Sequence, residues 1–218
     1  MKKFILFTFL YLSTLIAFGQ NQIRVRAGIL STNTTVSEYN RGLDFFYYDS
    51  VTLYSRVTAP QVNVDIDIDL GKNFFFSTGL GYSEKGLEGI HYNNGDYWYD
   101  AKQKYMGSNF LLKYHYKFND EKFGVFAAAG FRADFAVGGP NNAEIATVAG
   151  AEYFNAFGTF NVAEFSFSTI VGVSYKLGAG DLTIDANFLN GLSDTMVDPF
   201  IVGRTFSIGA TVGYSIYF

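Results

Sequence analysis

Apolar and polar residues alternate with a period of two in eight separate segments of this 218-residue chain. The clearest is 62–70, Val-Asn-Val-Asp-Ile-Asp-Ile-Asp-Leu, which places carboxylates on one face and aliphatic side chains on the other. A period of two is the side-chain repeat of a β-strand, so each segment predicts a strand with one apolar face. The eight segments are 23–29, 62–70, 74–83, 105–118, 123–135, 164–177, 181–187 and 205–218.

The connections between these segments alternate strictly in length. We expect long connections at 32–61, 84–104, 136–163 and 188–204, and tight turns at 70–73, 119–122 and 178–180. Long loops on one side of a membrane and short turns on the other are the topology of an outer-membrane barrel, with the turns and both termini in the periplasm. The sequence therefore predicts an all-β fold, an eight-stranded antiparallel transmembrane up-and-down β-barrel.

Aromatic residues, which make up 19% of the chain, support a membrane barrel over a soluble one. On the predicted strands they sort into two girdles, as a bilayer-spanning barrel requires. A soluble barrel would hide its aromatics inside and show its charges outside, so we favour it less. The periplasmic girdle is expected to hold Phe74, Tyr114, Tyr116, Phe118, Phe123, Tyr175 and Phe218. The outer girdle is expected to hold Tyr82, Phe131, Phe135, Phe165 and Phe206.

The N-terminus has the pattern of a secretory signal peptide. Lys2 and Lys3 precede the apolar run 4–18, and Ala17-Phe18-Gly19 fits a small-residue cleavage site. A membrane anchor is the alternative, but the run is short for a span, which needs about 20 apolar residues. The absence of cysteine excludes a lipoprotein anchor. We therefore expect a signal peptide at 1–19, a barrel domain at 20–218, and a multi-pass protein of the Gram-negative outer membrane.

The C-terminal segment has apolar or aromatic residues at every second position back from a terminal phenylalanine. These residues are Tyr214, Ile216 and Phe218. The pattern resembles the C-terminal strand that barrel-assembly machinery recognises in this class of protein. We therefore expect that machinery as a partner during biogenesis, with outer-membrane lipid as the permanent surroundings.

Two short stretches resemble the PorT-type outer-membrane β-barrel family. One is Tyr82-Ser83-Glu84-Lys85-Gly86 at the end of a strand, and the other is the Leu-Leu-Lys-Tyr run at 111–114 in the next. The chain departs from the family in having 106–109, Met-Gly-Ser-Asn, where an acidic-x-Pro step is usual. The resemblance implies the small-barrel form of OmpA and OmpX, and the family's namesake takes part in type IX secretion.

Charged residues on the inward faces predict a network of ion pairs inside the barrel. The start of the first segment and the end of the second meet at the periplasmic side. We therefore expect Arg24 and Arg26 beside Asp67 and Asp69.

The inward face of the third segment is mostly serine and glycine, which leaves space inside the barrel. Lys113 and Lys117 of the fourth segment can reach across that space toward Asp65 and Asp67.

Two further pairs are expected between later segments, Arg132 with Glu164 and Lys176 with Asp185. Buried charges must be paired, and an eight-stranded barrel is just wide enough for side chains to fill. A salt-bridged plug is the favoured interpretation, and an ion path or proton relay is the alternative.

An enzymatic role is disfavoured by the sequence. The two histidines, His91 and His115, have no partners in a catalytic or metal-binding pattern, and no nucleotide-binding motif stands in a convincing setting. We expect no catalytic residue, no metal and no cofactor. The formal net charge of −4 argues against a nucleic-acid partner.

The long loops carry clusters of aromatic residues that could bind a partner. The leading candidates are Phe46 and Tyr48 in the first loop and Tyr97 and Trp98 in the second. Exposed aromatic clusters often mark binding surfaces, although the same residues could extend a hairpin above the membrane. We expect a structural or interaction role, through these loops or as a subunit of an envelope complex. The alternatives are a narrow transport pore and an accessory component of type IX secretion.

Overall fold

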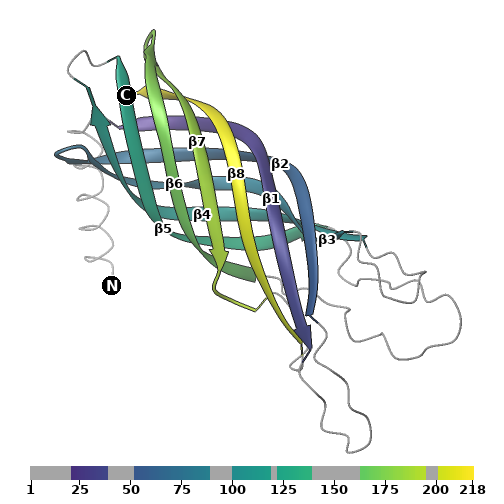
Figure 1. The fold of residues 1–218 in the computed structure, drawn as a ribbon. Helices are drawn as coiled ribbons and strands as arrows, with labels where there is room; N and C mark the ends of the chain where they lie inside the picture. Colours follow the sequence, from purple (N-terminus) through teal and green to yellow (C-terminus); the bar gives the residue numbers. More distant parts are fainter. Residues whose placement is uncertain (1–20, 39–51, 89–99, 119–121, 139–162, 195–200) are drawn as a thin grey trace, which may run out of the picture.

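The computed structural model describes residues 21–38, 52–88, 100–118, 122–138, 163–194 and 201–218. These residues form eight antiparallel strands that close into a barrel (Figure 1). The strands are β1 (Gln22–Glu38), β2 (Thr52–Gly71), β3 (Phe74–Glu88), β4 (Asp100–Lys117), β5 (Phe123–Gly138), β6 (Ala163–Leu177), β7 (Gly180–Gly191) and β8 (Ile201–Tyr217). The predicted fold class is confirmed.

The strands are strongly tilted, because the pairing register is staggered around the barrel. A path of directly paired residues that leaves β1 at Gln22 passes through every strand and returns to β1 at Thr32, ten residues farther along. A stagger of this kind is what closes a sheet of tilted strands into a barrel. The barrel is therefore narrow, and side chains from opposite walls can meet inside it.

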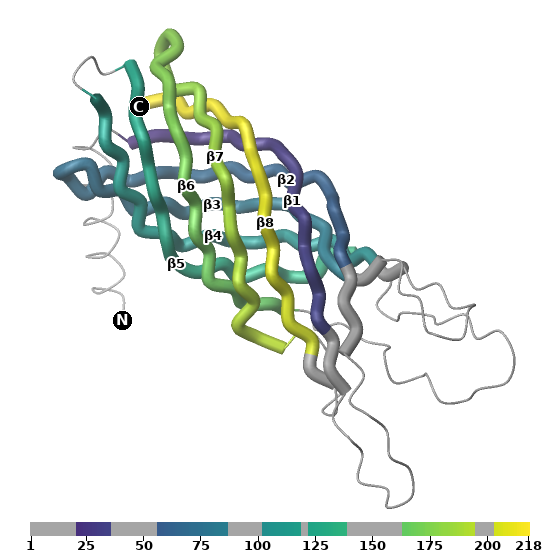
Figure 2. Tube along the Cα trace, in the orientation of Figure 1, coloured from purple at the N-terminus to yellow at the C-terminus, as the bar shows by residue number. Residues whose placement is uncertain are grey.

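The β2–β3 and β6–β7 turns, the start of β1 and the end of β8 lie at one end of the barrel, here called the turn end (Figure 2). The β2–β3 turn has positive φ at Gly71, Lys72 and Asn73, and Gly178 has positive φ in the β6–β7 turn. Glycine adopts this conformation without strain, which permits such tight reversals. The amide of Phe218 donates to the carbonyl of Asn21 at this end. The opposite end is here called the loop end.

The strands run farther toward the loop end than the alternation predicted. The β1–β2 ladder continues to the pair of Ser37 and Thr52, so much of the predicted 32–61 loop is strand. Strand β7 likewise extends to Gly191 instead of ending at 187. The predicted boundary of β1 was wrong because its extension carries Ser31, Asn33 and Thr35 on the outward face, which hides the apolar alternation. In β7, the apolar Phe188 and Leu189 follow one another, which interrupts the alternation.

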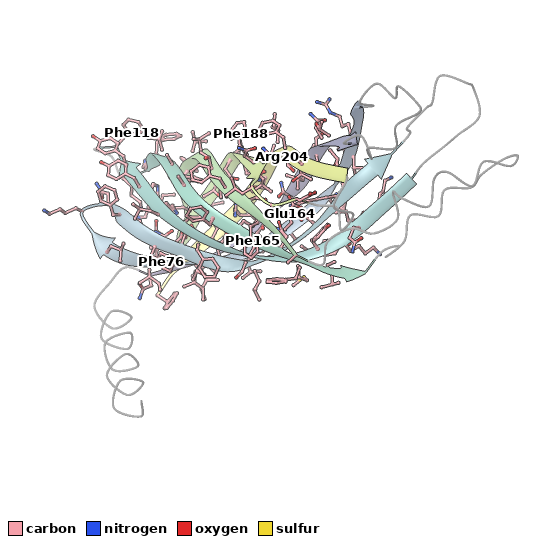
Figure 3. All side chains as sticks on the ribbon, turned by 90° about the horizontal axis from the view of Figure 1, so that it is seen from below. Phe76, Phe118, Glu164, Phe165, Phe188 and Arg204 are labelled. Atoms are coloured by element: carbon pink, nitrogen blue, oxygen red, sulfur yellow. The ribbon has the colours of Figure 1, made fainter. Side chains whose placement is uncertain are left out.

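The outward face is apolar and the inward face is polar, which is the inverse of a soluble barrel. Phe131 and Leu80 are each 59% exposed, whereas Arg24, Asp65 and Asp67 are fully buried. Phe76 and Phe118 point away from the barrel (Figure 3). Within the described ranges, no helix is long and apolar enough to cross a membrane.

Outward aromatic rings contact one another at two heights. Near the turn end, Phe74 lies against Tyr114 and Phe123 against Tyr175, with ring centroids 5.0 and 4.9 Å apart. On the loop-end side, Phe131 lies against a ring of β6, Phe167, at 5.9 Å. These contacts correspond to the two predicted aromatic girdles.

Candidate functional site in the barrel lumen

Buried charges inside the described part of the barrel gather in three networks stacked along its axis. The central network comprises Arg24, Arg26, Asp65, Asp67, Lys113 and Asp185, and the loop-end network comprises Lys85, Arg132, Asp134 and Glu164. The turn-end network comprises Lys117, Asp181 and Tyr217. In formal charge each network is neutral, because cations and carboxylates are equal in number.

Arg26 organises the central network from β1. Its Nε and Nη2 atoms both lie 2.8 Å from Asp65 Oδ2, and its Nη1 donates to Asp185 Oδ1 at 3.1 Å. Asp185 also accepts a hydrogen bond of 2.7 Å from Thr211. One guanidinium therefore joins carboxylates of β2 and β7 across the lumen.

Lys113 and Arg24 complete the central network on the side nearer the turn end. Lys113 Nζ donates to Asp67 Oδ2 at 2.6 Å. Arg24 Nη2 lies 3.5 Å from Asp65 and 3.8 Å from Asp67, and its guanidinium makes no hydrogen bond among the described residues. Lys113 and Arg24 also lie 5.0 and 5.4 Å from the ring centroid of Phe126, within cation–π range.

The loop-end network is built around Lys85, which is almost fully buried on β3. Its Nζ lies 2.8 Å from Asp134 and 3.1 Å from Glu164. Glu164 also accepts a hydrogen bond from Thr205, which ties β6 to β8. The Lys85 ammonium lies 5.5 Å from the ring centroid of Tyr105, so its remaining surface is also covered.

Arg132 of β5 extends the loop-end network toward the middle of the lumen. Its Nε lies 2.7 Å from Asp134 Oδ1, and its Nη1 donates to Asn63 at 3.2 Å. Gly107 and Gly81 leave the space that this guanidinium fills, since a Cβ at either position would overlap the Arg132 network.

The turn-end network is small and half-open to solvent. Lys117 Nζ donates to the hydroxyl of Tyr217 at 2.6 Å and lies 3.4 Å from Asp181. The Tyr217 hydroxyl in turn donates to Asp181. Just inside this network, His115 is buried and its Nε2 lies 2.8 Å from Ser174 Oγ.

An apolar cluster of Leu111, Phe126, Ala128 and Ile170 fills the lumen beside the central network. Gly172 faces Phe126, and a Cβ there would approach the ring to 2.5 Å. Charged groups and apolar side chains therefore pack against one another. This matches the expectation that the interior of an eight-stranded barrel is just wide enough for its side chains.

Several pairs predicted from the sequence are wrong in register. Arg26 contacts Asp65 and Asp185, and not Asp67. In the β1–β2 ladder, the residue directly opposite Asp65 is Arg24. Asp69 lies beyond this pairing, where its Oδ1 accepts a hydrogen bond from the amide of Gly71.

The predicted contacts of two lysines are also corrected. Lys117 contacts Asp181 and Tyr217 at the turn end, not Asp65 or Asp67. Lys176 is exposed and pairs across the sheet with Asp181, whereas Asp185 lies opposite Gly172.

Arg132 is opposite Ser166, and Glu164 is opposite Asp134, so the predicted pair of Arg132 and Glu164 is wrong. The cation that contacts Glu164 is Lys85, which is not among the predicted lumen residues. The signal was present, because Lys85 follows Ser77, Gly79, Gly81 and Ser83 in the same inward phase.

Other candidate residues lie elsewhere. The loop candidates Phe46, Tyr48, Tyr97 and Trp98, together with His91 and the signal peptide 1–19, fall outside the described residues. At the C-terminus, Ile216 and Phe218 are more than half exposed on the outward face, and the Tyr214 hydroxyl donates to the carbonyl of Leu177 at 2.7 Å. Among the residues described, no three side chains of histidine, aspartate or glutamate form a group able to hold a metal ion.

The inverted barrel, with its apolar wall and paired polar lumen, agrees with a comparison of the sequence with known families. The profile of the outer membrane protein β-barrel domain matches residues 18–197. The chain belongs to this family. It is therefore an outer-membrane β-barrel protein, and the topology of such barrels places the turn end in the periplasm and the loop end outside the cell. Among curated proteins, the search finds no significant match.

Solved structures with the same fold include outer-membrane proteins of different kinds. The outer membrane protein OprG from Pseudomonas aeruginosa aligns with a TM-score of 0.56 and 11% identity, over 91% of this chain and 97% of its own. The outer membrane protease OmpT from Escherichia coli aligns with a TM-score of 0.51 and 11% identity, again over 91% and 97% of the two chains. At such low identity these alignments show a shared fold only.

Proposed function

We propose that this protein is a sealed outer-membrane barrel that acts through contacts at its extracellular end and transports no solute. The observation that carries the proposal is the stack of three charge-neutral networks in the lumen. A solute crossing the barrel would have to separate Lys85 from Asp134 and Arg26 from Asp65. Buried ion pairs are costly to break, because each partner is left as an uncompensated charge.

In a sealed barrel of this kind, the extracellular segments are the part of the protein whose sequence is free to vary for binding. Wall residues must face lipid on one side and fill the lumen on the other, whereas loops on a rigid scaffold commonly carry binding. We propose Phe46, Tyr48, Tyr97 and Trp98 as the anchors, since aromatic residues supply much of the energy in protein interfaces. The partner would be another protein of the cell envelope.

A role in type IX secretion is a second candidate, supported by the two stretches that resemble the PorT-type family. Both stretches contribute to the lumen: Ser83 and Lys85 are buried in or beside the loop-end network, and Leu111 and Lys113 are buried near the central one. The resemblance therefore concerns residues that fill the barrel. It supports a shared way of sealing the lumen more directly than a shared secretion partner.

The proposal is tested by native pull-down from outer membranes with two loop variants. One variant shortens 92–99 to a tight turn, and the other is Phe46→Ser with Tyr48→Ser. Both should keep the gel mobility shift between unboiled and boiled samples that marks a folded barrel, and at least one should lose the partner. Retention of every partner by both folded variants contradicts the proposal. Secretion components among the lost partners would favour the second candidate.

A further inference from the structure

The outward wall changes character at the loop end of three adjacent strands. Outward residues of β1, β2 and β8 are apolar up to Ile29, Pro60 and Phe206. Beyond that level, the outward side chains that the structure describes on these strands are polar or basic. The residues of this surface, here called the arginine face, are Ser31, Asn33 and Thr35 of β1, Arg56 and Thr58 of β2, and Arg204 of β8.

The arginine face is continuous across the sheet. Asn33 pairs directly with Arg56, and Thr35 pairs directly with Arg204, so the two arginines flank β1. Arg56 Nε donates to Asn33 Oδ1 at 3.1 Å, which holds one edge of its guanidinium against the wall. Thr58 and Ser31 share a hydrogen bond of 3.2 Å. Arg204 (Figure 3) and Arg56 are both exposed.

The rest of the wall at the loop end differs from this face. On β3 and β4, the exposed Lys104 pairs directly with Glu84, so charges of opposite sign face each other. On β5 and β6 the outward residues remain apolar, with Val137 57% and Phe165 52% exposed. The arginine face as defined contains two cations, Arg56 and Arg204, and no carboxylate. Asp194 accepts a hydrogen bond from the amide of Gly203, which precedes Arg204 in the chain. The arginine face therefore keeps a net positive charge.

We propose that the arginine face binds phosphate groups of lipids in the outer leaflet of the outer membrane. The face begins where the apolar wall ends, which is the level at which lipid headgroups meet the barrel. Guanidinium groups match phosphate oxygens with two parallel hydrogen bonds, and they retain their charge at this boundary. The hydroxyl and amide groups of Ser31, Thr35 and Asn33 lie between the arginines, where they can bind the sugar or glycerol part of a headgroup.

The test measures how much diphosphoryl lipid A stays on the folded full chain in detergent, by native mass spectrometry. The variant Arg56→Gln with Arg204→Gln should bind this lipid roughly tenfold or more weakly, since each basic residue near a membrane surface contributes about 1 kcal/mol. Arg56→Lys with Arg204→Lys should fall between this variant and the wild type. The matched control is Lys72→Gln with Lys176→Gln, which removes two exposed charges from the turn end and should bind like the wild type.

Heat-dependent mobility on gels establishes that each variant is folded before binding is compared. Equal retention by the arginine-to-glutamine variant and the wild type overturns the proposal. An equal loss in the arginine variant and the lysine control also overturns it, because the effect would then come from overall charge. Displacement of the lipid by inorganic phosphate at matched ionic strength would show that the face binds free phosphate, and the lipid assignment would be wrong. None of these outcomes depends on whether the lumen is sealed.

Discussion

The two faces of the barrel wall obey different rules, although they belong to the same eight strands. The lipid face needs only apolar side chains at alternate positions, and its members, such as Val64 and Leu112, are 45% and 53% exposed on the outward side. The lumen face needs particular partners at particular heights, such as Asp67 with Lys113 and Lys85 with Glu164. The lipid face should therefore tolerate exchanges within a residue class, whereas the lumen face should tolerate only matched changes.

The largest effect is expected from breaking one lumen pair on one side. Asp67→Leu leaves Lys113 and Arg24 buried without their shared carboxylate. Loss of one partner of a buried pair typically costs about 3–5 kcal/mol of stability. Urea unfolding in detergent or lipid vesicles should show this loss.

The matched change, Asp67→Leu with Lys113→Met, should recover much of the stability that the single change loses, because the ammonium that hydrogen-bonds to Asp67 is removed together with it. Asp67→Leu with Arg26→Met is the control, since Arg26 contacts Asp65 and Asp185 instead. Recovery in the control but not in the matched variant would show that the register is wrong.

A somewhat smaller loss is expected from placing a charge on the lipid face. Leu112 is 53% exposed on β4, between the two aromatic girdles. Leu112→Arg should cost about 2–4 kcal/mol, as for a basic residue near the bilayer midplane of a barrel. Leu112→Met should be close to neutral in the same unfolding experiment. A severe loss from Leu112→Met would mean that the lipid face is also specific.

Within the lumen, the two arginines of β1 should differ. Arg26 makes close hydrogen bonds to two carboxylates, whereas Arg24 lies 3.5 Å or more from its partners. Hydrogen bonds to charged groups contribute roughly 1.5–3 kcal/mol each, so Arg26→Met should destabilise more than Arg24→Met by about that amount. The comparison uses unfolding midpoints of the two single variants. Equal midpoints would mean that distance from the carboxylates does not decide the contribution of either arginine.

The smallest effect on stability, but a clear effect on assembly, is expected at the C-terminus. Phe218 is 58% exposed and makes a backbone hydrogen bond to Asn21. Its deletion should lower the folded fraction in membranes and leave export intact. The readout is heat-modifiable protein in outer-membrane fractions, with Leu177→Ala as a control that removes an outward side chain at the same end. Wild-type levels after the deletion would show that the terminal residue carries no assembly signal.

The sequence predicted the strand number, the order and the inward or outward direction of side chains, because the alternation records which face meets lipid. It could not predict the register. A shift by two residues keeps every side chain on its face, so the pattern is the same whether Arg132 is opposite Glu164 or Ser166. The wrong pairs between neighbouring strands, including Arg26 with Asp67 and Lys176 with Asp185, are errors of this even-numbered kind.

The strand ends were missed for a different reason. Beyond the apolar band, the outward face of β1 carries Ser31, Asn33 and Thr35, so polar residues follow one another on both faces. Such a stretch is read as a loop, although its backbone pairs with β2 as regularly as before. The same polar stretch forms part of the arginine face, which therefore could not be recognised until the strand was known to continue.

Single-channel recording in planar bilayers tests the sealed lumen most directly. The wild-type protein should give no steady conductance steps, because the central and loop-end networks fill the barrel with paired charges. A variant that shortens the side chains of both networks, with Arg26→Ser, Asp65→Ser, Lys85→Ser and Asp134→Ser, keeps the lumen neutral and should conduct, once heat-dependent gel mobility has shown that it is folded. Steady conductance steps from the wild type would contradict the account and make transport the leading function.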